Sequence, residues 1–193
     1  ETNVIGSMNV LDAIKQMKKK CSVVMITSDK CYENVEWIWG YKETDTLGGA
    51  DPYSASKAAT EIGISSYVRS FFNPVKNIRI ASARAGNVIG GGDWAENRIV
   101  PDIVKAWSNN KIVNLRNPHS TRPWQHVMEP LSGYLNLAAQ LSVDKKLHGE
   151  SFNFGPSDNK NYSVKHLVES MCKYWNKSEW KIIKANNEHH ESG

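Results

Sequence analysis

Hydrophobic residues recur along the chain with two different periodicities. From Val4 to Ile14 they follow one another at intervals of three and four, which predicts an amphipathic helix over residues 2–19. Residues 22–28 instead contain an unbroken apolar, partly β-branched run that ends in hydroxyl groups. Such a run is typical of a strand that is buried on both faces, as the strands of parallel sheets are. The chain is therefore expected to begin with a helix that leads into a buried strand.

The next stretch predicts that this strand belongs to a βαβ unit. A loop reaches to Pro52, with Asp51 as a candidate N-cap and the proline at the first helical position. A helix over 53–72 follows, and residues 78–85 form a second apolar strand. Strand, helix and strand in this order predict an α/β fold that holds the second half of a doubly wound, Rossmann-like parallel sheet.

The remaining residues carry shorter elements of mixed type, without an internal repeat or a low-complexity segment. They predict a small mixed α/β lobe that suits substrate binding. We therefore place one domain over 1–88 and a second over 89–193. The elements expected after the first domain are a helix at 97–108, a strand at 112–115, a helix at 129–142, a strand at 151–154 and a helix at 163–175.

Tyr53 and Lys57 supply the most informative chemistry of the chain. A tyrosine four places before a lysine on a helix puts both side chains on one face. An ammonium group near a phenol stabilises the phenolate, which can then take a proton from a sugar hydroxyl. Ser28 and Asp29 follow the first strand, and ligands of open parallel sheets bind beyond the carboxyl ends of the strands. Taken alone, the spacing of Tyr53 and Lys57 is also typical of an ordinary solvated helix face.

Several motifs in a fixed order resemble the extended short-chain dehydrogenases/reductases that act on nucleotide sugars. They are the hydroxyl at the strand end, Tyr-x-x-x-Lys on the next helix, and Arg-Ala-Gly-Asn-Val-Ile-Gly at 84–90. The run Thr-Ser-Asp-Lys-Cys-Tyr at 27–32 and the run Gly-Gly-Gly-Asp-Trp at 90–94 resemble the CDP-glucose 4,6-dehydratase branch. The likeness extends from Glu1 to about Trp175. It implies an NAD-dependent lyase of deoxysugar and O-antigen biosynthesis.

The resemblance assigns roles at the end of the first strand and on the helix after it. Ser28 would hydrogen-bond the C4 oxygen of the sugar, and Tyr53 would be the base for that hydroxyl. Lys57 would stabilise the phenolate and hold the nicotinamide ribose of NAD. Asn3 would lie on the cofactor side and order a water of the proton relay, although an asparagine near a helix start is also a common cap.

A 4,6-dehydratase must also eliminate water across C5 and C6 of the sugar. This step needs an acid for the C6 hydroxyl and a base for the C5 proton. The resemblance places Asp29 and Lys30 there, with Asp29 as the acid. A lysine acts as a base only where burial or neighbouring cations lower its pKa, so the role of Lys30 stays open. The alternative for the pair is an exposed turn.

A nucleotide sugar also needs cations for its diphosphate and a flat slot for its base. A guanidinium group binds phosphate oxygens in a bidentate fork. Arg116 and Arg122 flank a short polar segment, and the resemblance matches Arg122 to a diphosphate-binding arginine. It also matches Asn87 to a residue that contacts the substrate, and Arg98 is a third candidate cation. A surface arginine is the alternative for each.

The glycine-rich run at 90–95 fits G-x-G-x-x-A literally. No strand and ribose-binding acid follow at the needed positions, so we interpret it as a flexible loop on the substrate side instead. Trp94 and Trp124 could form a wall for the sugar or the base, or could belong to the core. We expect the phosphate-binding turn of the NAD site in residues that precede Glu1, and the chain also looks interrupted at its far end.

Composition fits a globular piece of a cytoplasmic enzyme. The 40% of hydrophobic residues could bury one good core. A net charge of +4 is too small to favour nucleic-acid binding, and no apolar run approaches the length of a membrane span. Three cysteines without C-x-x-C spacing and six histidines without ligand spacing argue against a disulfide framework and a metal site.

The helix that carries the tyrosine also indicates a possible partner. Four small side chains, from Ala55 to Ser66, form a stripe that allows another element to pack closely. The stripe could face the sheet of its own subunit. The resemblance implies instead a homodimer, in which helices 2–19 and 53–72 pair with their copies.

Three functions stay open at this point. The first is a CDP-glucose 4,6-dehydratase. The second is another enzyme of nucleotide sugars, such as a 4-epimerase or a dehydratase for GDP- or dTDP-sugars, although an epimerase has no need of Asp29 and Lys30. The third is a non-catalytic fragment that only dimerises or binds a sugar nucleotide.

Overall fold

The computed structural model describes the chain in three stretches, residues 1–73, 77–156 and 162–183. These residues form two compact units. The first unit combines Glu1–Gly86 with Met128–Gly155, and the second combines Asn87–Val127 with the part of the chain that begins at Pro156. Each unit encloses apolar clusters of its own.

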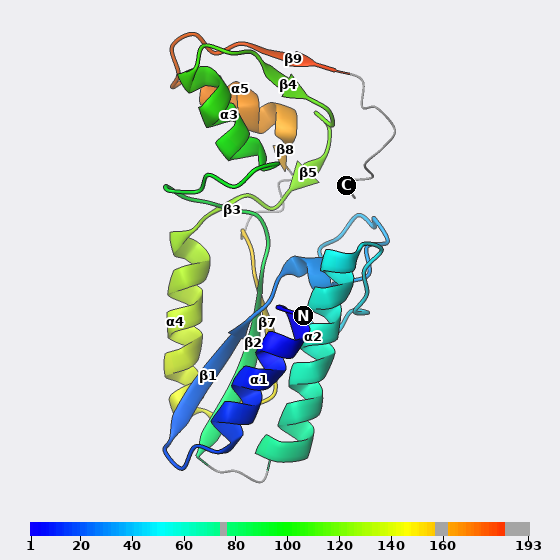
Figure 1. Cartoon of the computed structure of the whole chain (residues 1–193), viewed down its shortest axis with the longest axis vertical. Helices are drawn as coiled ribbons and strands as arrows, with labels where there is room; N and C mark the ends of the chain where they lie inside the picture. Colours follow the sequence, from blue (N-terminus) through cyan, green and yellow to red (C-terminus); the bar gives the residue numbers. More distant parts are fainter. Residues whose placement is uncertain (74–76, 157–161, 184–193) are drawn as a thin grey trace. The chain divides into compact units, whose positions relative to one another are not determined.

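A three-stranded parallel sheet forms the centre of the first unit (Figure 1). Its strands are β1 (Cys21–Ile26), β2 (Ile78–Ala85) and β7 (Ser151–Phe154), in the order β1-β2-β7. The register pairs Cys21 with Ile78 at one end of β1. Because both pairings are parallel, the carboxyl ends of all three strands lie at the same edge.

Helices cover both faces of this sheet (Figure 1). α1 (Val4–Lys15) and α2 (Pro52–Tyr67) lie on one face, and α4 (Met128–Val143) lies on the other. Ile80 of β2 packs with α1 and α2, whereas its neighbour Ala81 packs with α4, because successive side chains of a strand point to opposite faces. This doubly wound arrangement confirms the predicted α/β fold class.

The loop before α2 ends in the predicted cap. Asp51 accepts hydrogen bonds from the backbone N–H groups of Tyr53, at 2.9 Å, and Ser54, at 3.0 Å. Gly49 approaches this turn so closely that a Cβ there would come within 2.3 Å of the backbone nitrogen of Ala55. Glycine is therefore required where the loop passes the start of the helix.

Two helices end earlier than their hydrophobic patterns predict. α1 ends at Lys15, so the lysines at 18–20 lie beyond it. α2 ends at Tyr67 and continues as a π-helical turn, η2 (Val68–Phe72), so the two elements together span the predicted helix. The ring of Phe72 is fully buried, which shows why the apolar pattern extends to that residue.

The structure divides the chain differently from the predicted boundary at residue 88, because Met128–Gly155 belongs to the first unit. A 3₁₀ turn, η3 (Lys145–Leu147), leads from α4 to β7, which pairs with β2. The ring of Phe154 fills the space beside Gly133 of α4, where a Cβ would come within 2.3 Å of the ring. The functions assigned to the two parts of the chain stay predictions.

The described residues of the second unit form short strands and two helices. α3 (Ile99–Ser108) and α5 (Val164–Cys172) contribute Ile103, Trp107 and Val168 to its buried apolar cluster. Its strands pair two by two: β3 (Val88–Ile89) with β6 (Gln125–His126), β4 (Val113–Leu115) with β9 (Trp180–Ile182), and β5 (Thr121–Arg122) with β8 (Tyr162–Ser163). This agrees with the small mixed lobe that the sequence predicts after the first domain.

Candidate active site

Tyr53 and Lys57 lie together at the N-terminal end of α2. The Lys57 ammonium nitrogen is 5.7 Å from the centroid of the Tyr53 ring. The tyrosine is 54% exposed, so its side chain is accessible from solvent. The four-residue spacing thus places the two side chains on one face of the helix, as the sequence predicts.

The segment that follows β1 forms a tight turn, and we call residues 27–32 the strand-end turn. The N–H of Thr27 donates to a carbonyl of β2 at 2.8 Å, which extends the pairing beyond β1. Ser28 caps a 3₁₀ turn, η1 (Asp29–Cys31): its hydroxyl accepts from the N–H of Lys30 at 3.2 Å. The same hydroxyl donates to a carboxylate oxygen of Asp29 at 3.0 Å. The strand-end turn packs against α2.

Lys30 links this turn to the start of α2. Hydrogen bonds from the hydroxyl and the N–H of Ser54 hold the pKa of the Asp51 carboxyl below its usual value, and the charge of Lys30 adds to the effect. Asp51 caps the helix two residues before Tyr53. Tyr53 and Lys57 thus lie on the helix against which the turn with Ser28, Asp29 and Lys30 packs, while the catalytic roles of the five residues stay predictions.

Asn3 reaches across to α2 instead of capping α1. Its side-chain amide donates to the Ser56 hydroxyl at 2.9 Å, and that hydroxyl donates to the Tyr53 carbonyl at 2.7 Å. Asn3 has helical backbone angles and makes no side-chain capping bond. The predicted cofactor-side asparagine thus lies beside the residue that precedes Lys57.

A buried ion pair joins α2 to β2, and the sequence patterns did not predict it. The guanidinium of Arg84 donates to Oε2 of Glu61 at 2.8 Å, and the two side chains are 3% and 2% exposed. Glu61 also accepts hydrogen bonds from the hydroxyls of Thr27 and Ser82. The period of two along β2 would have placed Arg84 on the face covered by α2, but no local pattern identifies its partner.

Burial and pairing together set the charges of this pair. Burial alone would raise the pKa of Glu61, but hydrogen bonds from Arg84 and Thr27 outweigh it, so the pKa is lowered and the carboxylate stays charged. Burial opposes the charge of Arg84, yet the bond to Glu61 raises its pKa above the ordinary value. Tyr32 accepts from Arg84 at 2.7 Å, and burial raises its pKa, so its phenol stays neutral.

The three cysteines, Cys21, Cys31 and Cys172, are free. Cys31 is fully buried in the strand-end turn, and burial raises the pKa of its thiol to about 12. Within the stretches that the structure describes, no three His, Cys, Asp or Glu side chains come together in a way that could hold a metal ion. No helix of those stretches is long and apolar enough to cross a bilayer.

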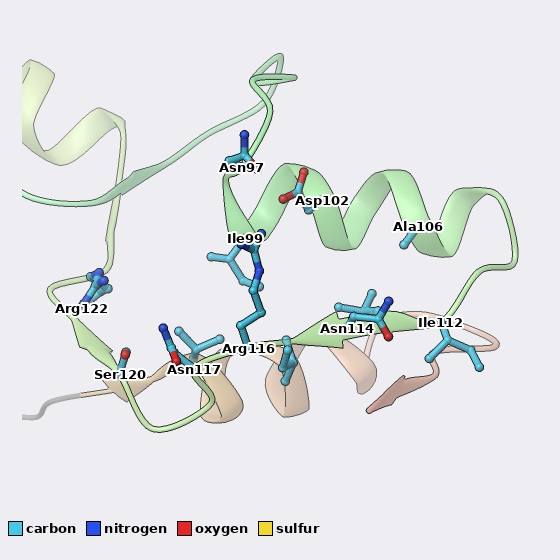
Figure 2. A pocket seen from close by; sticks show the side chains of 13 residues that line it. Asn97, Ile99, Asp102, Ala106, Ile112, Asn114, Arg116, Asn117, Ser120 and Arg122 are labelled. Carbon is cyan, nitrogen blue, oxygen red and sulfur yellow. The ribbon is translucent and has the colours of Figure 1, made fainter. Parts of the chain in front are cut away.

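A cavity of about 180 Å³ lies beside α3 and β4 in the second unit (Figure 2). Two of the predicted substrate-binding residues, Arg116 and Arg122, line it. Figure 2 shows the Arg116 side chain extending from the end of β4 toward Ile99 at the start of α3. The other polar lining residues are Asn97, Asp102, Asn114, Asn117 and Ser120.

The two other predicted substrate residues, Asn87 and Arg98, do not line this cavity. The Asn87 carbonyl accepts from the N–H of Gln125 at 3.1 Å, beside the β3–β6 pair. Arg98 precedes α3 and lies 3.7 Å from Asp93 at the surface of the unit. Trp94 is 61% exposed and so is no core residue. The cavity thus gathers two of the four side chains that the sequence predicts for the substrate.

The sequence matches the family model described as GDP-mannose 4,6 dehydratase over residues 1–192. It is 46% identical to CDP-glucose 4,6-dehydratase of Salmonella typhimurium, in an alignment that covers 99% of this chain and 54% of that protein. It is 24% identical to CDP-paratose 2-epimerase of Salmonella typhi, over 91% of this chain and 56% of that protein. The chain spans about half the length of the curated relatives that it matches.

Two solved structures of nucleotide-sugar enzymes share the fold. dTDP-glucose 4,6-dehydratase of Bacillus anthracis, in complex with NAD, matches with a TM-score of 0.77 at 21% identity, over 96% of this chain and 56% of that one. UDP-glucuronic acid 4-epimerase of Bacillus cereus, in complex with UDP-glucuronic acid and NAD, matches with a TM-score of 0.78 at 18% identity, over 95% and 55%. The Rossmann-like fold and the resemblance to nucleotide-sugar dehydratases are confirmed. The chain belongs to the GDP-mannose 4,6-dehydratase family.

Proposed function

We propose that the protein to which these residues belong is a CDP-glucose 4,6-dehydratase, a lyase that converts CDP-glucose to CDP-4-keto-6-deoxyglucose. The observation that carries this proposal is the cluster at the start of α2. There the Lys57 ammonium lies 5.7 Å from the centre of the Tyr53 ring, on a helix packed against the strand-end turn. The 46% identity to a CDP-glucose 4,6-dehydratase, over 99% of this chain, favours the CDP-sugar among the alternatives.

The first proposed step removes the proton of the C4 hydroxyl of glucose. Tyr53 is the proposed base, and the neighbouring Lys57 charge would stabilise its phenolate by electrostatic attraction. Ser28 would donate a hydrogen bond to the same sugar oxygen. Its hydroxyl donates to Asp29 in this structure, and a hydroxyl can rotate to a new acceptor when a substrate binds.

NAD is the proposed cofactor, and the polar groups at the start of α2 fit it. When bound, it supplies the oxidation of the sugar and the later reduction. The Lys57 ammonium is a donor, and the Tyr53 phenolate an acceptor, suited to the hydroxyls of the nicotinamide ribose. Asn3, tied to Ser56 at 2.9 Å, is proposed to order a water beside them.

Asp29 and Lys30 are the residues proposed for the elimination. Oxidation at C4 makes the C5 proton acidic, so a modest base suffices, and the departing C6 hydroxyl needs a proton. Asp29 shares a hydrogen bond with Ser28, which supports a carboxyl group within reach of the same sugar ring. We assign the acid to Asp29, and the role of Lys30 in the elimination stays open.

The cavity of the second unit is the proposed site for part of the nucleotide. Its volume of about 180 Å³ is smaller than the roughly 300–1,000 Å³ of pockets that enclose whole ligands, so it suits one portion of the molecule. Arg116 and Arg122 would bind the diphosphate through their guanidinium groups. Asn87 and Arg98 are retained as proposed contacts with the rest of the substrate.

A homodimer in the cytoplasm is the proposed state of the protein. Ala55, Ala59 and Ser66 are exposed and Gly63 packs against Met8 of α1, so the stripe of small side chains on α2 does not face the sheet. Apolar side chains on the outer surfaces of the two helices remain exposed, namely Ile5 at 55%, Val10 at 49% and Ile62 at 59%. Such a surface favours burial against the same surface of a second copy.

The test uses the protein produced from its complete reading frame, with CDP-glucose and NAD. The 4-keto-6-deoxy product is followed by its near-ultraviolet absorbance in base. We expect Tyr53→Phe to lower turnover by about 10²–10⁴-fold, the usual contribution of a general base. Tyr174→Phe is the matched control, because it removes the same hydroxyl from a tyrosine that is 89% exposed in the second unit.

The outcomes separate the alternatives. Absence of turnover in the unmodified protein would contradict the dehydratase proposal. A product with inverted C4 and no loss of water would identify a 4-epimerase. Faster turnover of a GDP- or dTDP-sugar would show that the substrate carries a nucleobase other than cytosine. If Tyr53→Phe is as active as Tyr174→Phe, Tyr53 has no part in the reaction.

A further inference from the structure

Glu61 lies at the centre of a hydrogen-bond network that joins four elements of the first unit. Its Oε1 atom accepts from the Thr27 hydroxyl, directly after β1. Its Oε2 atom accepts from Ser82 of β2 at 2.8 Å, from Arg84 at 2.8 Å and from Ser151 of β7 at 3.4 Å. Helix α2, strands β2 and β7 and the residue that follows β1 therefore meet at one carboxylate, whose residue is only 3% exposed.

Arg84 extends this network to the other end of the strand-end turn. Its Nη1 atom donates to the Tyr32 hydroxyl at 2.7 Å and to the Glu43 carbonyl at 3.1 Å. Tyr32 is the last residue of the turn, and Thr27 is the first. The Glu61–Arg84 pair thus holds both ends of the segment that contains the proposed Ser28, Asp29 and Lys30.

The same pair is fixed to the helix of the proposed base. Glu61 follows Lys57 by four residues and Tyr53 by eight on α2. A buried charge without its partner is strongly unfavourable, so the ion pair and its hydroxyl donors favour a single arrangement. Sites that carry out chemistry need side chains held to within roughly 0.5 Å, and a buried polar network can supply that rigidity.

We propose that Glu61 and Arg84 are positioning residues, which hold the strand-end turn with Ser28 in place against the helix that carries Tyr53 and Lys57. The identity of the positioned groups rests on the proposed function. The pair touches no substrate in this proposal. It acts through the Thr27 hydroxyl, the side chain that ties Glu61 to the residue before Ser28.

Two matched variants separate positioning from stability alone. Thr27→Val and Ser82→Ala each remove one hydroxyl that donates to Glu61, and both leave the ion pair intact. Ser82 is 2% exposed, whereas Thr27 is half-buried. If these hydroxyls served stability alone, Ser82→Ala should therefore speed exchange in residues 27–32 at least as much as Thr27→Val does. Positioning predicts an effect on the strand-end turn for Thr27→Val only. Thr27→Ser keeps the hydroxyl and is the rescue variant.

The first measurement is hydrogen–deuterium exchange of the backbone amides of residues 27–32 in the complete protein. Loss of a hydrogen bond to a charged group should speed their exchange about tenfold or more in Thr27→Val. The same amides should stay within about twofold of the unmodified protein in Ser82→Ala and in Thr27→Ser.

The second measurement is turnover of CDP-glucose. We expect Thr27→Val to lower kcat about tenfold while KM changes less than about twofold, because the proposed nucleotide contacts are untouched. Thr27→Ser should restore kcat. Equal effects of Thr27→Val and Ser82→Ala on exchange in residues 27–32 would overturn the positioning role, whether or not the protein turns over. A clear contrast in exchange with no turnover in any form would contradict only the proposed function.

Discussion

Each unit of the molecule holds an arginine–carboxylate pair, in opposite surroundings. In the first unit, Arg84 and Glu61 lie 2.8 Å apart, and their side chains are 3% and 2% exposed. In the second unit, Arg98 and Asp93 lie 3.7 Å apart, and their side chains are 62% and 36% exposed. The same two functional groups thus meet in the protein interior in the first pair and in water in the second.

The contrast shows that the surroundings of an ion pair decide what it can do. The buried pair is surrounded by further donors and acceptors, and its attraction is little screened, so its atoms keep one arrangement. The exposed pair is weakened by solvent and salt, so each member can exchange its partner at small cost. We therefore expect fixed geometry at the buried pair of the first unit, and an adjustable arrangement of the pair at the surface of the second.

The largest expected effect comes from breaking the buried pair. Arg84→Met should lower the free energy of unfolding by about 3–5 kcal/mol, because it leaves the Glu61 charge buried without its cation. Urea denaturation of the complete protein measures the loss. Arg79→Met is the control on the same strand, since its guanidinium donates to the Leu141 carbonyl at 2.9 Å and forms no ion pair within the described residues. A loss no larger than that of the control would contradict the contrast between the pairs.

The buried pair should also make the free energy of unfolding depend on pH in acid. The folded protein lowers the pKa of Glu61, so its contribution is fully present above the unfolded value of about 4.3 and is lost as pH falls through the folded value. Each unit by which the pKa is lowered is worth about 1.4 kcal/mol. Between about pH 5 and pH 3, Glu61→Gln should therefore lose less stability than the unmodified protein. Parallel pH profiles of the two proteins would argue against a lowered Glu61 pKa.

A smaller effect is expected at the surface of the first unit, where Asp51 caps α2. Asp51→Ala should cost about 0.5–2 kcal/mol, because the N–H groups of Tyr53 and Ser54 lose their acceptor. Asp51→Asn retains an accepting oxygen and should keep most of the stability. Thermal unfolding of the three proteins measures the difference. If Asp51→Asn loses as much stability as Asp51→Ala, the stabilisation comes from the charge of Asp51 and not from its accepting oxygen.

The smallest effect is expected for the exposed pair. Arg98→Met should change the free energy of unfolding by less than about 1 kcal/mol, and the change should disappear in high salt. Urea denaturation at low and high ionic strength provides the measurement. A loss comparable to that of Arg84→Met would show that Arg98 has a structural role that its exposure does not indicate.

The sequence predicted those features that depend on neighbouring residues. Helical spacing placed Tyr53 beside Lys57, and the Asp51 cap fixed the start of the helix. The apolar runs at the two long strands predicted a parallel sheet, and the strand-end position of Ser28 followed from it. In each case, the local chain carries enough information for the structure.

Features that depend on distant residues could not be predicted in this way. β7 pairs with β2, and α4 packs on the face of the sheet that carries Ala81, so contacts between distant parts of the chain assign 128–155 to the first unit. Glu61 and Arg84 are likewise far apart in sequence, and a charged residue alone does not identify its partner. The cavity collects its lining from several segments of the second unit, so sequence motifs identified two arginines but not the space between α3 and β4.

Because Cys31 is buried in the strand-end turn, the reactivity of its thiol reports when the turn opens. Only thiolates react quickly with alkylating reagents, and this thiol combines a pKa of about 12 with complete inaccessibility. The rate at which Cys31 is alkylated in the native protein therefore depends on how often the turn opens. The partly accessible Cys21 and Cys172 should be alkylated faster and serve as the reference. Cys31 directly follows Lys30, so its alkylation rate reports the opening of this part of the turn without a substrate or an engineered probe.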